Sequence, residues 1–324
     1  MTRCAWLVML ATGAAGAATL AHVGTLRVPA GFEGHMAYDA VSKRMWLISY
    51  GPPARKSGPC EVMELDRADG TVLAKAELPL LGGFGPPVSA GGYLYQPVNF
   101  ESRIYKIRVG DRQHFGEIEG FIPIPTVADL AATGSAAGGE RLKFPWLEVS
   151  GIAVAPNGDL ILHAGDLGEL ITIDRTSGRV LKRTPTMKGL GGIAGAPDSS
   201  GRFYLLANLD PDDAAARDKA RRFDLRAPEA VPWKRSKVTL FSHRAAQKEV
   251  YWVLLDGESG EPLASVDDTD SPAFASGVTI SEFQAVGNGY GELTFLAMGP
   301  GGIVTMKWNP DREANQTSEH KEMR

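Results

Sequence analysis

The chain has few of the residues that many enzymes and small secreted proteins depend on. Its 324 residues include two cysteines, Cys4 and Cys60, and neither belongs to a Cys-x-x-Cys pair or a zinc-ligand spacing. Cys4 lies in an apolar N-terminal stretch, so removal of that stretch would leave Cys60 without a partner. The sequence also has no G-x-S-x-G, H-E-x-x-H or G-x-x-x-x-G-K-[ST] motif. It therefore offers no complete motif for a serine hydrolase, a zincin or a P-loop protein.

The chain also lacks an excess of positive charge. Its 34 Lys and Arg residues against 38 Asp and Glu give a formal charge of −4, which argues against a nucleic-acid partner. Apolar residues make up 44% and charged residues 22%, as in a soluble globular protein. Beyond the N-terminus, no segment is long and apolar enough to predict a membrane span.

Residues 1–18 have the layout of a secretory signal peptide. Arg3 supplies the positive start, an apolar run follows from Cys4, and Ala15-Gly16-Ala17 provides the small-residue site. We expect cleavage after Ala17 or Ala18, and therefore an exported protein, periplasmic or secreted, and monomeric. An uncleaved anchor is the alternative, because the apolar stretch reaches Ala21. The lack of disulfides favours the periplasm.

Glycine and proline are abundant, with 38 and 21 residues, and they punctuate a repeated β unit. The clearest copy places four short strands at 149–155, 160–164, 169–174 and 179–183. Asn157-Gly158 between the first two is a strong hairpin signal, because type I′ turns need positive φ at both central residues. Four short antiparallel strands in one repeat are typical of a β-propeller blade.

Other copies predict an all-β fold of five visible blades within a single domain, residues 19–310. A sixth would have to lie in 210–275. The segment 24–28 has no partner of its own, and we expect it to pair with the last blade and close the ring. A β-sandwich is the alternative, but the recurring Asp-x-x-(Asp/Ser)-Gly turn favours the propeller. Insertions are predicted at 121–147 and 210–236, and a polar tail at 311–324.

In a ring of such blades, two kinds of loop emerge on one face: those between blades and those between second and third strands. Polar residues at these places are therefore expected to meet at one mouth of the central channel. The predicted ligand-binding residues are Glu33, His35, Asn99, Glu101, Glu148, His163, Asp166, Asn208 and Asp210. Such oxygen-rich loops suit a hard divalent cation such as Ca²⁺, and the histidines add a general base or a softer metal ligand.

The hairpin from Ser150 to Leu160 resembles the blade signature of NHL-type and SMP-30/gluconolactonase-like propellers. Glu33-Gly34, ahead of the first hairpin, is similar to the metal-binding Glu-Gly pair of the lactonase family. This resemblance implies a propeller fold and a metal-ligand role for Glu33. It also implies a metal-dependent hydrolase that acts on a lactone or ester.

Two main functions follow from these observations. The leading hypothesis is an exported propeller that binds a protein partner or a small ligand at the channel mouth without catalysis. The alternative is the metal-dependent hydrolase, with His35 or His163 as base or further ligand. A third hypothesis, a peptidoglycan- or sugar-binding module, would use Trp146 and Trp233 in the loops as stacking surfaces.

Overall fold

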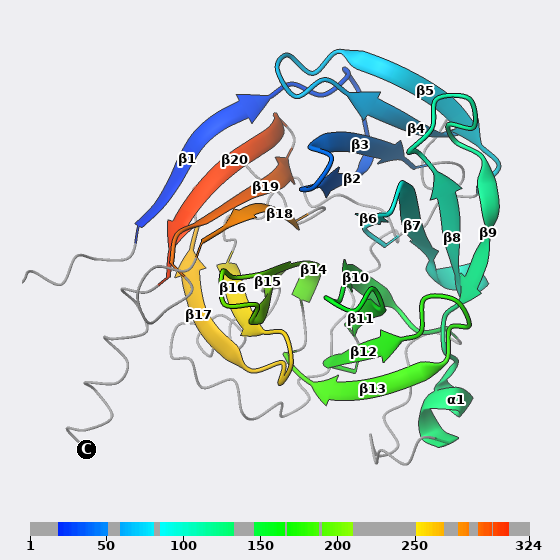
Figure 1. Ribbon diagram of the computed structural model, residues 1–324, viewed down its shortest axis with the longest axis vertical. Coiled ribbons are helices and arrows are strands. Elements are labelled where there is room, and N and C mark those ends of the chain that lie inside the picture. The colour runs from blue at the N-terminus through cyan, green and yellow to red at the C-terminus, as the bar shows by residue number, and fades with distance from the viewer. Residues whose placement is uncertain are drawn as a thin grey trace, which may run out of the picture.

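The chain folds into a ring of five four-stranded antiparallel sheets, which confirms the predicted β-propeller (Figure 1). The computed structural model describes residues 19–50, 59–80, 85–132, 146–165, 167–187, 190–209, 251–268, 278–284, 291–299 and 301–310. Within this part of the chain the only helices are the short α1 (Val127–Ala132) and the 3-10 turn η1 (Asn99–Glu101). The predicted tail at 311–324 and the predicted insertion at 210–236 lie outside these residues, as do residues 133–145 of the predicted insertion at 121–147.

Strands follow chain order from the axis to the rim in the first four blades. Blade 1 contains β2 (Gly34–Asp39), β3 (Arg44–Ser49), β4 (Cys60–Leu65) and β5 (Val72–Leu78). Blade 2 contains β6 (Val88–Ala90), β7 (Tyr93–Val98), β8 (Arg103–Arg108) and β9 (Ile118–Pro123). Blade 3 contains β10 (Val149–Val154), β11 (Leu160–Ala164), β12 (Glu169–Ile173) and β13 (Val180–Pro185). Blade 4 contains β14 (Leu190–Pro197), β15 (Phe203–Leu209), β16 (Tyr251–Asp256) and β17 (Pro262–Asp267).

Blade 5 combines the two ends of the chain. It contains β18 (Val278–Phe283), β19 (Leu293–Gly299) and β20 (Gly302–Asn309), and β1 (Thr19–Leu26) pairs antiparallel with β20 as its outer strand. This confirms the predicted ring closure. His22 of β1 also reaches blade 4, because its Nε2 lies 3.0 Å from an Asp268 carboxylate oxygen. The other oxygen of Asp268 accepts a hydrogen bond from the indole N–H of Trp252 at 3.0 Å.

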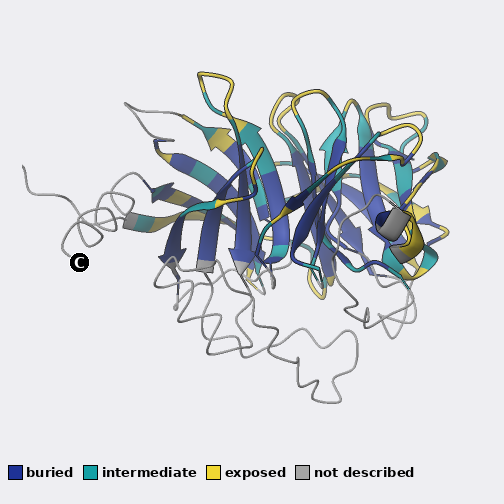
Figure 2. Ribbon diagram, turned by 90° about the horizontal axis from the view of Figure 1, so that it is seen from below, coloured by how far each residue is buried: buried dark blue, intermediate teal, exposed yellow. Residues whose placement is uncertain are grey.

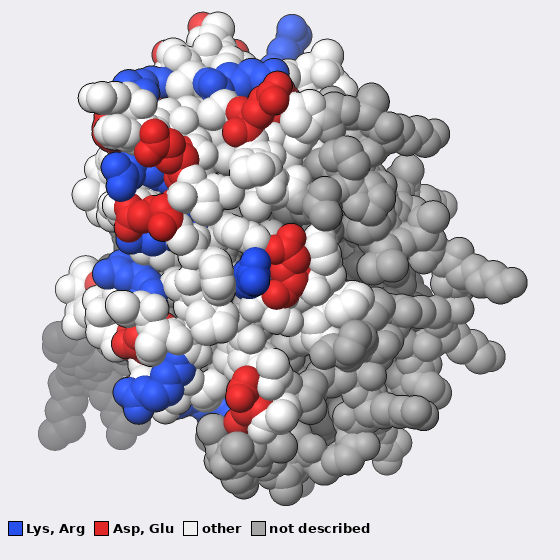
Figure 3. All heavy atoms as spheres, turned by 90° about the vertical axis from the view of Figure 1, so that its right-hand side faces the viewer, with Lys and Arg blue, Asp and Glu red and all other residues white. Residues whose placement is uncertain are grey.

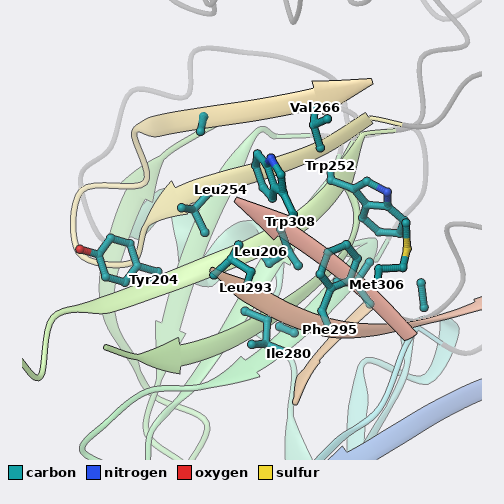
Figure 4. Packing of buried hydrophobic residues seen from close by; sticks show 14 of the residues in the cluster. Tyr204, Leu206, Trp252, Leu254, Val266, Ile280, Leu293, Phe295, Met306 and Trp308 are labelled. Carbon is teal, nitrogen blue, oxygen red and sulfur yellow. The ribbon is translucent and has the colours of Figure 1, made fainter. Parts of the chain in front are cut away.

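The hydrophobic core lies between neighbouring blades, because alternate side chains of each strand face opposite neighbours. In blade 4, Leu206 packs towards blade 5 while Leu205 and Ala207 pack towards blade 3. Figure 4 shows the blade 4–5 core, where the rings of Trp252 and Phe295 meet at a centroid distance of 4.9 Å. Figure 2 shows the buried residues concentrated in the strands, while many of the exposed residues lie in the turns.

The turn between the third and fourth strands repeats one chemistry in three blades. Asp66, Asp174 and Asp256 each accept backbone N–H bonds from the turn that they begin. A glycine with positive φ follows four residues later in each turn, and its N–H bonds to the aspartate carbonyl at 2.9 Å. This is the Asp-x-x-(Asp/Ser)-Gly pattern of the sequence, and it reverses the chain in five residues.

The glycine of this turn also touches the preceding blade. A Cβ on Gly178 would lie 2.7 Å from the carbonyl oxygen of Pro123 at the end of β9. Gly70 and Gly260 would likewise meet the carbonyl oxygens of Arg27 and Pro185, at 2.3 and 2.6 Å. In blade 2, a Cβ on Gly116 would meet that of Ala76 on β5. Each turn therefore docks on the outer strand of the blade before it, as the rim in Figure 1 shows.

The boundary of the first predicted insertion differs from the structure. Residues 118–123 form β9, the outer strand of blade 2, so the strand extends three residues into the range 121–147. Pro123 is compatible with this position because it ends a strand at the sheet edge. Thr126 then caps α1, where its Oγ accepts the Asp129 N–H at 3.2 Å. No helix in the described ranges is long and apolar enough to cross a membrane.

Gly178→Ala should lower the free energy of unfolding by about 2 kcal/mol or more. The left-handed φ of 73° costs an alanine about 1 kcal/mol, and the methyl group also pushes against the neighbouring blade. Gly201→Ala is the matched control, because its φ is 85° and no atom lies within 4 Å of the added Cβ. Urea unfolding of both variants measures the difference, and equal losses would contradict the docking contact.

Candidate functional site

The mouth of the channel is the face where first strands begin and second strands end. The first strands contact one another in a closed circle, β2 to β6, β10, β14, β18 and back to β2. We use "mouth" for the residues at and next to these strand ends: Gly34, Val88, Val149, Leu190 and Val278, and Ser49, Val98, Ala164, Leu209 and Gly299. The turns that dock neighbouring blades leave from the opposite ends of the strands.

Seven predicted site residues belong to the described part of the chain, whereas Asp166 and Asp210 lie outside it. His35, His163 and Asn208 are buried in the strands. Glu33 is exposed directly before β2, and the other three, Asn99, Glu101 and Glu148, are half-buried. These seven residues therefore have different surroundings at the mouth.

His163 is fully buried and held at both ring nitrogens. Its Nε2 lies 3.0 Å from the Met187 carbonyl oxygen, and its Nδ1 lies 2.6 Å from Ser150 Oγ. A carbonyl only accepts, so Nε2 carries the proton and Nδ1 accepts from the serine hydroxyl. Burial lowers the pKa of His163 to about 4. These contacts tie blade 3 to the segment leading into blade 4, and they keep the imidazole neutral near pH 7.

His35 and Tyr50 form a second buried pair at the mouth of blade 1. The Tyr50 hydroxyl lies 3.1 Å from His35 Nε2, and the two rings meet edge to face at 5.2 Å. Burial raises the pKa of Tyr50, and the nearby charge of Glu33 adds to the effect. Tyr50 therefore stays a neutral phenol.

Glu101 binds residues on the rim side of η1. Its carboxylate accepts a hydrogen bond from the Tyr105 hydroxyl and lies 3.8 Å from an Arg103 guanidinium nitrogen. Tyr105 and Arg103 belong to β8, the third strand of the blade. The strand order places β8 one strand farther from the axis than β7, so Glu101 makes these contacts away from the channel.

Two carboxamides of blade 2 each have one end paired and one end unpaired. Gln96 Nε2 donates to the carbonyl oxygens of Gly85 at 2.7 Å and Pro97 at 3.0 Å. Asn99 Nδ2 donates to the Val149 carbonyl at 3.2 Å, and a Cβ on Gly85 would lie 2.5 Å from that same oxygen. Among the described residues, Gln96 Oε1 and Asn99 Oδ1 are buried and have no hydrogen-bond partner. We call Gly85, Gln96, Asn99 and Val149 the amide cluster.

Asn208 occupies in blade 4 the register position of His163 in blade 3. His163 pairs with Gly151 and Asn208 with Gly192, and in both blades the first strand has an irregularity one residue earlier. That earlier residue is Ser150 in blade 3, which binds the imidazole. In blade 4 it is Gly191, which has no hydroxyl to offer.

The amide of Asn208 is consequently left without a partner in the described structure. Its side chain is fully buried, and neither Nδ2 nor Oδ1 has a hydrogen-bond partner there. A Cβ on Gly191 would lie 2.7 Å from Nδ2, so the amide lies directly against this glycine. Strand alternation places Asn208 on the face of Leu206, towards blade 5.

The described residues contain no group of three or more His, Cys, Asp and Glu side chains placed to hold a metal ion. The rim shown in Figure 3 carries acidic and basic side chains next to one another. One example on blade 2 is Glu119, which binds both Lys106 and Arg108. Opposite charges in contact cancel at a distance, so this face has no continuous positive surface.

Sequence reasoning missed Gln96 and Tyr50. Tyr50 lies directly after the mouth end of β3, and Gln96 lies two residues before the mouth end of β7. Gln96 lies within the run Tyr93–Val98, where a single amide among apolar residues is the available signal. That Asn208 lacks the serine found in blade 3 becomes clear only from the strand register.

No protein-family profile and no curated protein sequence matches this chain. Among solved structures, glutaminyl cyclase from Myxococcus xanthus is 10% identical over 90% of this chain and 97% of its own, with a TM-score of 0.52. A streptogramin B lyase is 12% identical over 86% and 65%, with a TM-score of 0.38. A virginiamycin B lyase from Staphylococcus aureus is 13% identical over 89% and 74%, at 0.37. The first of these similarities supports the propeller fold, and at this identity it shows the fold alone.

The buried His163 should make stability depend on pH. Its folded pKa of about 4 lies below its ordinary value of 6.5, so the unfolded chain takes up a proton first as the pH falls. The free energy of unfolding should therefore fall between about pH 6.5 and pH 4, by about 3 kcal/mol at most. The variant His163→Asn has at this position the residue type that blade 4 has at Asn208. It should lose this part of the pH dependence.

The control for this prediction is His114→Asn, because His114 lies on an exposed turn. Urea unfolding across the pH range compares the slopes of the three proteins. A slope that survives in His163→Asn would show that another group causes it.

Proposed function

We propose that the protein is a binding protein that takes a small polar ligand at the mouth of its channel. The observation that supports this most directly is Asn208, whose donor and acceptor atoms are both buried and unpaired within the described structure. More than nine in ten buried polar groups in proteins have a partner, and an unpaired one costs about 1–3 kcal/mol. A ligand that bonds to the amide would remove this cost.

A small molecule suits this site better than a protein surface. The unpaired atoms of Asn208, Gln96 and Asn99 lie below the surface, where a flat protein face does not reach. Asn208 can both donate and accept, so it suits a neutral polar group. Burying a charged group there would require compensation from an opposite charge.

The geometry favours binding over the metal-dependent hydrolase. Glu33, the residue implied by the lactonase resemblance, is exposed, and the described chain provides no three-residue metal group around it. His35 and His163, the two candidate bases, are both buried and already hydrogen-bonded. A Ca²⁺ ligand remains part of the test, because amide oxygens are suitable ligands for it.

Export is part of the proposal. The described ring-closing strand β1 (Thr19–Leu26) lies after the predicted cleavage at Ala17 or Ala18. Cleavage there would leave every residue of β1 in place for pairing with β20. The protein recovered from a host with a secretory system should therefore start at Ala18 or Thr19, as intact mass measurement would show. A mass that retains residues 1–17 would support the uncleaved anchor instead.

Asn208→Leu tests the binding site. Leucine has a similar shape and removes both unpaired atoms, so the ligand-free protein should be as stable as wild type or about 1 kcal/mol more stable. Thermal unfolding is followed with Ca²⁺, Mg²⁺, glucose, sorbitol, gluconolactone and N-acetylalanine amide. A ligand at about 100 times its Kd should stabilise wild type by about 2.7 kcal/mol, and the variant should lose this shift.

Asn157→Ala is the matched control, because Asn157 is an exposed asparagine in a turn at the far end of the blade from the mouth. It should keep the full ligand shift. A wild-type protein that none of the six compounds stabilises, or a shift that persists in Asn208→Leu, would contradict the proposal. Gluconolactone turnover that stops on chelation would support the hydrolase.

A further inference from the structure

The orientation of both amides in the amide cluster is fixed by their surroundings. Gln96 faces two peptide carbonyls and Asn99 faces one, and carbonyl oxygens only accept hydrogen bonds. The NH₂ group of each side chain must therefore lie on that side. A flipped amide would place two oxygens against each other. Oε1 of Gln96 and Oδ1 of Asn99 are thus the ends that lack partners.

The cluster consequently has a surplus of acceptors. Two buried oxygens require donors, whereas both NH₂ groups already have acceptors. A carboxylate or phosphate would bring more lone pairs and be repelled. A hydroxyl, an N–H group or a cation would be attracted, so the missing partner must be one of these.

The charge of the donor decides which of these three groups fits the amide cluster. The amide cluster contains no ionised side chain, and Glu101 in the same turn already binds Tyr105 and Arg103. A cation buried against neutral amides would lose its hydration without an opposite charge to replace it. A neutral hydroxyl has no such cost, and blade 3 already contains the arrangement: the Ser150 hydroxyl donates to the buried acceptor of His163.

The turn that contains Asn99 also offers an apolar surface. Phe100, the next residue, is 37% exposed although it is a large hydrophobic side chain. Gly85, whose carbonyl orients Gln96, has no side chain and lies close to Val149. An exposed aromatic residue in the same turn as one of the acceptors suits a molecule with hydroxyl groups on an apolar carbon frame.

We infer that the amide cluster binds a neutral polyhydroxylated ligand, a polyol or saccharide, through hydroxyls that donate to Gln96 Oε1 and Asn99 Oδ1. This rests on the proposed function, since both place a small polar ligand at the mouth. It goes further by naming the ligand class and a second set of side chains. No metal and no bond breakage is involved.

A pair of substitutions at Asn99 separates the acceptor from the structural contact. Asn99→Leu and Asn99→Asp both lose the hydrogen bond to Val149, but only Asp keeps an oxygen in the place of Oδ1. Calorimetric titration of the full chain uses glucose, N-acetylglucosamine and sorbitol, with CaCl₂ and propylammonium chloride as the competing classes. The affinity for at least one of the first three should fall about tenfold or more in Asn99→Leu. In Asn99→Asp it should stay within about threefold of wild type.

The possible outcomes distinguish a failure of the amide-cluster inference from a failure of the proposed function. An equal loss in both variants would mean that Asn99 acts through its bond to Val149, and would overturn the acceptor role. Binding of Ca²⁺ or propylammonium in place of the hydroxyl compounds would overturn the ligand class but leave a ligand-binding mouth. If none of the five probes binds, the cluster holds ordered water only and the inference is wrong. The proposed function would then depend on the separate Asn208 experiment.

Discussion

The ring depends on a close backbone contact between neighbouring blades. In the first four blades, a glycine in the turn before the outer strand lies against the outer strand of the blade before it, where a Cβ would overlap. The contact sets how closely successive blades can approach. The fifth junction has no such turn, because the outer strand of blade 5 is β1. There β1 is held by its pairing with β20 and by the contact of His22 with Asp268.

The docking contacts lie at the strand ends opposite the mouth. They place no requirement on the residue types at the mouth itself. Three of the four docking turns share the Asp-x-x-(Asp/Ser)-Gly pattern, and the blade 2 turn departs from it but keeps the glycine, whereas the mouth residues vary from blade to blade. Position for position, blade 3 has a histidine with two partners and blade 4 an asparagine with none among the described residues. Packing does not explain the difference, since both side chains are fully buried. A polar group retained at a cost to stability is typical of a functional position.

The sequence predicted the architecture because the relevant signals are local. Strand alternation and Asp-x-x-Ser-Gly turns depend on neighbouring residues, and even the pairing of β1 followed from its lack of a local partner. For the candidate site, the sequence predicted only which residues share one face of the ring. Glu101 contacts Arg103 and Tyr105 on the rim side of the turn. These residues are near Glu101 in sequence, but their contacts with it are known only from the structure. Gln96 was missed because a single amide in an otherwise apolar strand gives no sign of a site in the sequence. Its carbonyl partners are known only from the structure.

The proposed ligand site faces the blade that closes the ring. Asn208 faces blade 5, whose outer strand is β1, and Trp252 of blade 4 bonds to the same Asp268 that contacts β1. A ligand that binds Asn208 only in the closed ring must stabilise the closed ring by the free energy of its binding. If the proposed ligand binds there, anything that loosens β1 must weaken ligand binding by the same linkage. Under the proposal, the mouth end of blade 4 and the outer strand of blade 5 would therefore be coupled.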